Sequence, residues 1–144
     1  MTTADALQTT LAAEHAAVYV YGVLGAQTSR SSSPELYAAL SGAYAEHRAR
    51  RDVLTRAVTD AGEEPVAAAP AYDLPAGLDR STVVTRTARD IEDRCAATYA
   101  ALVASTEGYR RRWAIGALND AAVRVLAFRG TPEMLPGADE YTDR

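Results

Sequence analysis

The sequence predicts an all-α protein folded as a four-helix bundle, and three observations support this fold class. The 144 residues include 31 alanines but only one phenylalanine and one tryptophan, a composition that favours closely packed helices over a β-sandwich. Apolar residues recur every three or four positions in four separate segments. Proline and glycine gather between those segments. The length suits a single domain, which we place at residues 1–130, followed by an irregular tail at 131–144.

The first two helices are expected at residues 3–28 and 34–61. The first contains no proline and carries a stripe at Leu7, Leu11, Val18, Tyr21 and Gly25. The second should begin with Ser33 as N-cap and Pro34 at the first helical position, and should end at a left-handed Gly62. Its stripe runs through Tyr37, Leu40, Tyr44, His47, Arg51, Leu54 and Val58.

The third and fourth helices are expected at residues 81–104 and 107–129. The third carries a stripe at Val84, Ala88, Ile91, Cys95, Thr98 and Leu102. A short turn at 105–108 should lead into the fourth helix, whose inward residues are Ala114, Ala117, Ala121, Val125 and Phe128. Gly130 followed by Pro132 predicts its end.

The connector between the second and third helices indicates the topology. Residues 62–79 contain three prolines and two glycines, which exclude a long helix. A second helix of about 27 residues is about 40 Å long, and an extended connector of roughly 17 residues reaches about 55 Å, so it can cross the whole bundle. One long crossover between two short turns is the ferritin-like arrangement, with the second and third helices parallel. An up-down-up-down bundle with a loose middle loop is the alternative.

Composition excludes several classes of protein. All 15 basic residues are arginine and the net charge is -4, which does not favour nonspecific binding to nucleic acid. No apolar run approaches the ~18 residues of a membrane-spanning helix, and the N-terminus lacks the features of a signal peptide, so we expect a soluble cytoplasmic protein without membrane partners. Cys95 is the only cysteine, which excludes an internal disulfide and predicts a small apolar core residue.

Ionisable residues interrupt the apolar stripes at the middle of the bundle. Glu14 lies where a core residue is expected on the first helix, and His47 does the same on the second. Because a buried carboxylate needs a partner, these two side chains are expected to meet. Burial would lower the pKa of His47 and a carboxylate would raise it, so the direction of its shift stays open. We predict a structural polar cluster of Glu14, Tyr44, His47, Arg51 and Glu92.

A metal site is the alternative interpretation of these residues. Di-iron bundles use a Glu-x-x-His motif on each of two helices, and this chain, whose histidines are His15 and His47, has none. A reduced site for one divalent ion such as iron, manganese or zinc would use Glu14, Glu46, His47 and Glu92. No other cofactor is expected.

Two further features have competing interpretations. Arginines late in the second helix and early in the fourth would approach one another in the crossover topology, so Arg51 and Arg111 are candidates for binding an anion; pairing with nearby acids is the alternative. Tyrosines at helical spacing, including Tyr21 and Tyr99, predict packing in the core and at its rim. No residue is assigned a catalytic role.

Motifs across the chain resemble those of a bacterial family of ferritin-like proteins, domain of unknown function 4439. The likeness rests on residues 11–22 of the first helix, 47–52 of the second and 71–75 of the connector, and extends over residues 7–129. It implies a self-associating ferritin-like four-helix bundle and supplies no catalytic residues. The missing Glu-x-x-His motifs argue against iron oxidation and storage.

Two functions therefore follow as expectations. The first is a non-catalytic structural or interaction module with a degenerate di-iron site. The sequence does not decide whether the protein is an enzyme, although its features favour a protein that is not. It would form a homodimer through alanine-rich faces that include Ala38, Ala39, Ala43 and Ala45, and an unidentified protein partner is a further expectation. The second is a metal-binding protein that uses the reduced carboxylate and histidine site.

Overall fold

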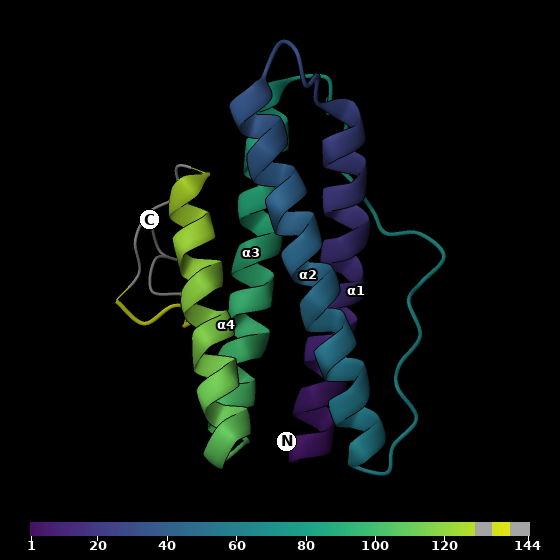
Figure 1. Cartoon of the computed structure of the whole chain (residues 1–144), viewed down its shortest axis with the longest axis vertical. Coiled ribbons are helices and arrows are strands. Elements are labelled where there is room, and N and C mark those ends of the chain that lie inside the picture. Colours follow the sequence, from purple (N-terminus) through teal and green to yellow (C-terminus); the bar gives the residue numbers. More distant parts are fainter. Residues whose placement is uncertain (129–133, 139–144) are drawn as a thin grey trace.

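The computed structural model describes residues 1–128 and 134–138, and within these ranges it contains four helices and no strand. They are α1 (Thr3–Gln27), α2 (Pro34–Asp60), α3 (Ser81–Ala104) and α4 (Gly108–Ala127) (Figure 1). Their bounds differ from the predicted ones by at most two residues. The predicted all-α four-helix fold is confirmed. None of the described helices combines the length and apolar character needed to cross a membrane.

The ends of α2 follow the local signals in the sequence. Ser33 holds the N-cap position and Pro34 the first turn, although the Ser33 side chain makes no capping hydrogen bond. Gly62 adopts a left-handed conformation with φ of 83°, and its N–H donates to the carbonyl of Thr59. The N–H of Glu63 donates to the carbonyl of Val58, which completes a Schellman-type end.

The helices pack as two hairpins joined along a central seam. The closely packed pairs are α1 with α2, α3 with α4, and α1 with α3. Figure 1 shows α2 running antiparallel to α1, and the connector returning beside α1 to the far end of the bundle before α3 begins. α2 and α3 therefore run in the same direction, as the crossover predicts.

Side chains of α1 attach the connector to the outside of the bundle. The side-chain amide of Gln8 donates to the carbonyl oxygen of Glu64 at 2.6 Å and accepts a hydrogen bond from the N–H of Val66 at 2.9 Å. His15 Nε2 lies 3.0 Å from the carbonyl oxygen of Val66. Farther along, the rings of Tyr19 and Tyr72 are in contact, with centroids 5.4 Å apart. The connector is thus held along much of α1.

The core is apolar at both ends and polar in the middle. Fully buried leucines occupy the inward faces of all helices but α4, which contributes alanines and Val125, and the buried Phe128 follows directly after α4. Glu14, His47 and Glu92 each have 0% exposure. On α2, the buried arginine is Arg50, and Arg51, predicted on the inward stripe, is only half-buried.

The C-terminal predictions are only partly covered by the described residues. The helix end predicted at Gly130 and Pro132 lies outside them, as does most of the tail predicted at 131–144. Within 134–138, Gly137 adopts a left-handed conformation with φ of 83° against the backbone of Ala96, where a Cβ would lie 2.6 Å from the carbonyl oxygen. This short segment therefore packs closely on α3.

Candidate functional site

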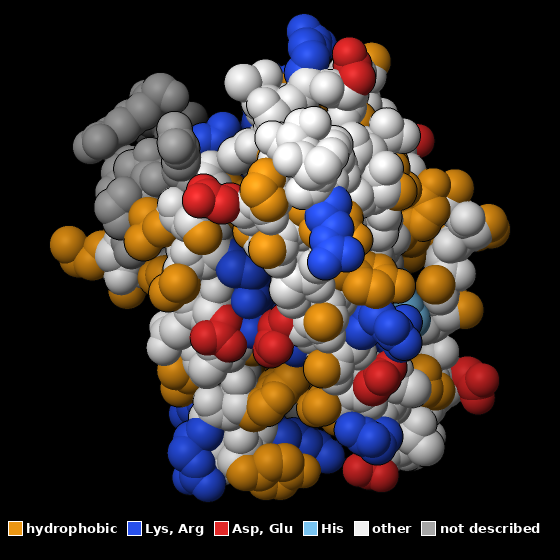
Figure 2. All heavy atoms as spheres, turned by 45° about the horizontal axis from the view of Figure 1, so that its top comes forward, with side chains coloured by type: hydrophobic (Ala, Val, Ile, Leu, Met, Phe, Trp, Pro, Cys, Tyr) orange, Lys and Arg blue, Asp and Glu red, His pale blue; other side chains and the backbone are white. Residues whose placement is uncertain are grey.

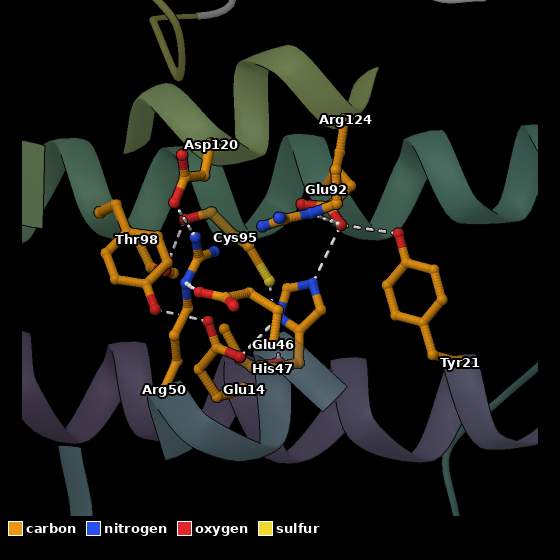
Figure 3. A network of polar contacts seen from close by, with 12 residues as sticks. Glu14, Tyr21, Glu46, His47, Arg50, Glu92, Cys95, Thr98, Asp120 and Arg124 are labelled. Carbon is orange, nitrogen blue, oxygen red and sulfur yellow. Dashed lines mark hydrogen bonds and ion pairs between the residues drawn. The ribbon is translucent and has the colours of Figure 1, made fainter. Parts of the chain in front are cut away.

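The imidazole of His47 lies between two buried carboxylates at the middle of the bundle (Figure 3). Its Nδ1 is 2.6 Å from Oε2 of Glu14 on α1, and its Nε2 is 2.9 Å from Oε1 of Glu92 on α3. The predicted meeting of Glu14 and His47 is therefore present. One side chain of α2 links α1 to α3.

Two tyrosines and an arginine complete what we call the buried polar cluster: Glu14, Tyr21, His47, Glu92, Tyr99 and Arg124. The hydroxyl of Tyr99 donates to Oε1 of Glu14 at 2.5 Å, and that of Tyr21 donates to Oε1 of Glu92 at 2.6 Å. Arg124 Nε on α4 donates to the same Glu92 oxygen at 2.7 Å. The Tyr21 ring also stacks on the imidazole, with centroids 5.2 Å apart. Every helix contributes to the cluster.

The two tyrosine contacts are reciprocal. Tyr21 follows Glu14 by seven residues on α1, and Tyr99 follows Glu92 by seven residues on α3, so each pair lies on one helix face two turns apart. Each tyrosine donates to the carboxylate of the other helix. The neighbouring helices α1 and α3 therefore present the same Glu-x6-Tyr pattern to each other.

Hydrogen bonding determines the protonation of His47. Burial lowers its pKa, but the hydrogen bonds to Glu14 and Glu92, together with their charges, outweigh burial and raise the pKa above its usual value. Both ring nitrogens face carboxylate oxygens, which only accept hydrogen bonds, so both nitrogens donate and the ring is an imidazolium. The direction that the sequence left open is thus upward.

Charges within the cluster balance. Burial raises the pKa of Glu92, but the hydrogen bond from His47 and the charges of His47 and Arg124 outweigh it and hold the pKa below its usual value. Burial also raises the pKa of Tyr21 and Tyr99 above the usual value, and the adjacent carboxylates raise it further, so both remain neutral donors. Two carboxylates face one imidazolium and one guanidinium, which gives a net charge of zero.

A second layer of charged residues lies on the side of α2 and α4. Arg50 is 4% exposed, donates to Oδ2 of Asp120 at 2.8 Å and lies over the Tyr99 ring at 5.6 Å. Glu46 is 48% exposed and approaches Arg50 at 3.4 Å (Figure 3). Glu46, predicted as a metal ligand, is therefore an outer partner of Arg50.

A thiol lies beside the histidine and offers a different set of ligands. One atom each of Glu14, His47 and Cys95 lie within 4.8 Å of one another, and all three residues are buried. Burial raises the pKa of the Cys95 thiol well above its usual value, and the charges of Glu14 and Glu92 raise it further. The thiol is therefore protonated, and metal binding here would require loss of protons from both Cys95 and His47.

Two residues predicted in the polar cluster have other partners. The Tyr44 ring is half-buried and is covered by the guanidinium of Arg48 at 5.6 Å. Arg51 donates twice to Oδ1 of Asp52. The next inward position after His47 is three residues on, at Arg50, and not four residues on, at Arg51. Both spacings keep a residue on the same helix face, so apolar periodicity alone does not distinguish them.

The predicted anion-binding pair is likewise engaged elsewhere. Arg51 is paired with Asp52, and Arg111 Nε donates to the carbonyl of Thr106 at 2.5 Å. Three residues of the buried polar cluster are not predicted in it from the sequence: Tyr21, Tyr99 and Arg124. The pairing of Arg50 with Glu46, four residues apart, follows the predicted pairing of the arginines with nearby acids. The repeated Glu-x6-Tyr spacing is the signal that identifies the two tyrosines.

Comparison with known proteins places this helical bundle in a family. The model for a domain of unknown function, DUF4439, matches residues 6–140. The chain belongs to the DUF4439 family. No curated protein matches its sequence. Among solved structures, a conserved hypothetical protein from Mycobacterium tuberculosis, Rv2844, is similar: identity is 29%, the match covers 88% of this chain and 87% of that one, and the TM-score is 0.80. The DUF4439 fold thus extends over nearly the whole described bundle.

Proposed function

We propose that this protein is a non-catalytic, ferritin-like helical module in which the buried polar cluster stabilises the bundle. The observation that carries the proposal is the double hydrogen bond of His47, whose imidazolium lies between Glu14 and Glu92. In a metal-dependent bundle a cation would lie among such carboxylates. Here a protonated side chain supplies that positive charge.

The balance of charge supports a structural role. Because Glu14 and Glu92 are already neutralised by His47 and Arg124, a divalent cation would be compensated in the core only if two protons left the site. Binding would also require the imidazolium to lose the proton that both carboxylates stabilise.

Exposed apolar residues support a role in association. Ile115, Val123 and Leu126 on α4 are 41%, 63% and 45% exposed. Of the alanines proposed to form a dimer face on α2, Ala43 is in the core and Ala38 is exposed. We propose a homodimer formed through exposed apolar helix faces, for which sedimentation at micromolar concentration is the measurement; a monomer throughout would contradict it.

A metal-binding function is the second candidate, and the close approach of Glu14, His47 and Cys95 is the observation that favours it. Elemental analysis of protein purified without chelator separates the two functions. The structural proposal expects far less than one iron, manganese or zinc per chain and an unfolding curve that EDTA leaves unchanged. Stoichiometric metal that disappears in His47→Gln and persists in His15→Gln would establish the second function instead.

A further inference from the structure

An apolar cavity of about 250 Å³ opens between the C-terminal part of α2 and the beginning of α4. Its interior is lined by Leu7 of α1, Leu54 of α2, Leu102 of α3 and Trp113 of α4. The three leucines are almost fully buried, and Trp113 is half-buried. All four helices therefore contribute apolar side chains to one recess at this end of the bundle.

The recess exists because α2 and α4 are not among the closely packed helix pairs. Nearer the middle of the bundle, the ion pair between Arg50 and Asp120 joins these two helices. The Trp113 ring packs edge-on against Tyr99 at 5.7 Å and so separates the recess from the buried polar cluster. The cavity is a distinct feature with an apolar base.

Charged side chains surround the mouth of the cavity. Arg56 and Asp60 of α2 and Arg110 of α4 line it, which gives two positive charges and one negative. Arg56 and Asp60 are four residues apart on one helix and offset each other, so the excess positive charge is centred on Arg110. At the lower end of the molecule, Figure 2 shows apolar side chains flanked by basic ones.

Arg110 lines the cavity, and its guanidinium is not fully hydrogen-bonded by the described residues. Its Nε is buried and has no hydrogen-bond partner within the part of the chain that the structure describes. Its guanidinium lies 5.8 Å from the centre of the Tyr109 ring, which also lines the cavity. A guanidinium at the mouth of an apolar cavity favours a carboxylate, because charge-assisted hydrogen bonds are the strongest that such a group makes.

We propose that this cavity binds a small carboxylate with an apolar body. The body lies against Leu54, Leu102 and Trp113, and the carboxylate accepts a hydrogen bond from Arg110. The cavity volume is near the lower end of the range for small-molecule sites, about 300 Å³, which favours a compact ligand over a peptide. A neutral ligand would make no charge-assisted hydrogen bond with Arg110, and a cation would be repelled by the arginines.

Fluorescence of Trp113 reports directly on the cavity, since it is the only tryptophan in the chain. The probe is octanoate, with octan-1-ol as the neutral compound of equal chain length. We expect a saturable change in emission with octanoate, and an affinity about tenfold higher than for octan-1-ol, which is the size of one charge-assisted hydrogen bond. Equal affinities, or no saturable change, would overturn the proposal.

Three variants locate the site. Arg110→Gln should lower the affinity for octanoate about tenfold and leave the affinity for octan-1-ol unchanged. Arg112 is an exposed arginine on the same helix, and Arg112→Gln should bind octanoate as the parent protein does. Ala57 lines the cavity, so Ala57→Phe should fill it and lower the affinity for both probes. Circular dichroism verifies that each variant is folded. Unchanged octanoate affinity in Arg110→Gln, or in a folded Ala57→Phe protein, would contradict binding at this position.

Discussion

Glu14 on α1 and His47 on α2 are joined by a hydrogen bond of 2.6 Å, and neither side chain has any exposed surface. The contact continues from His47 to Glu92 on α3 and from Glu92 to Arg124 on α4. Four charged side chains of alternating sign thus cross the bundle from its first helix to its last. Each inner member has two charged partners, so loss of one leaves others buried without compensation.

Glu14→Ala should therefore destabilise the protein strongly. The substitution leaves the imidazolium of His47 and the hydroxyl of Tyr99 without their acceptor, and we expect a loss of about 3 kcal/mol in the free energy of unfolding. Glu14→Gln should lose less, because its amide oxygen still accepts a hydrogen bond. Urea denaturation measures both variants. Glu46→Ala, which removes a half-exposed carboxylate, is the control and should cost less than about 1 kcal/mol. Similar losses for Glu14→Ala and Glu46→Ala would contradict the assignment.

The stability of the protein should decrease on both sides of a mildly acidic maximum. The pKa of His47 is raised in the folded state, so its contribution is complete below about pH 6.5 and is lost as the pH rises through the folded pKa. The pKa of Glu92 is lowered, so its contribution is complete above about pH 4.5 and is lost as the pH falls through the folded pKa. The titration of each of these two groups changes the free energy of unfolding by at most about 1.4 kcal/mol per pH unit.

Titration by NMR checks the histidine directly. Since the chain has two histidines, the variant His15→Gln leaves His47 as the only one, and its ring resonances can be followed without ambiguity. We expect a midpoint above 6.5. A midpoint below that value would mean that burial outweighs the two carboxylates, and would contradict the assignment of His47 as an imidazolium.

Tyr99→Phe should separate the hydroxyl contact from the packing of the ring. The substitution keeps the ring between Arg50 and Trp113 and removes the donor to Glu14, at a cost of about 1–2 kcal/mol. Tyr109→Phe, on a ring that is largely exposed, should cost about 0.5 kcal/mol or less. Thermal unfolding of the pair under one set of conditions makes the comparison. Equal effects would show that the hydroxyl of Tyr99 adds nothing to stability.

Substitution by alanine should change the free energy of unfolding in opposite directions at Gly62, just after α2, and at Gly42, within it. Gly62 is left-handed, so Gly62→Ala should destabilise by about 1 kcal/mol even though nothing lies near the added Cβ. Gly42 lies within the helix with equally open space, so Gly42→Ala should stabilise by about 0.5–1 kcal/mol. Chemical denaturation of both variants tests the assigned end of the helix, and a stabilising Gly62→Ala would contradict it.

The sequence predicts the four helices well because their signals are local. Apolar periodicity, the proline at the start of α2 and the glycine at its end each act within a few residues, and Glu14 and His47 are visible as charged residues on apolar stripes. The remaining partners depend on how helices are rotated against one another. Arg50 and Arg51 differ by 100° around α2, and the stripe alone does not decide which of them is buried.

Contacts between helices were harder to predict than positions within them. The helical spacing of Tyr21 and Tyr99 predicts packing, and in the structure their hydroxyls also donate to carboxylates on the opposite helix. Arg124 is 32 residues from Glu92 and on another helix, so no short-range pattern connects the two. Such pairs depend on the register between helices, which the connector and the core set together.

The connector contributes no side chain to the buried polar cluster, and this has a consequence for how the protein can be divided. A chain cut within residues 62–79 yields two helical fragments, each with an acidic residue balanced by a cation of its own: Glu14 with His47, and Glu92 with Arg124. Each fragment also holds the tyrosine donor that the other lacks. The contacts that would hold the two pieces together across the buried polar cluster are those from His47 and Tyr21 to Glu92 and from Tyr99 to Glu14, none of which needs an intact connector.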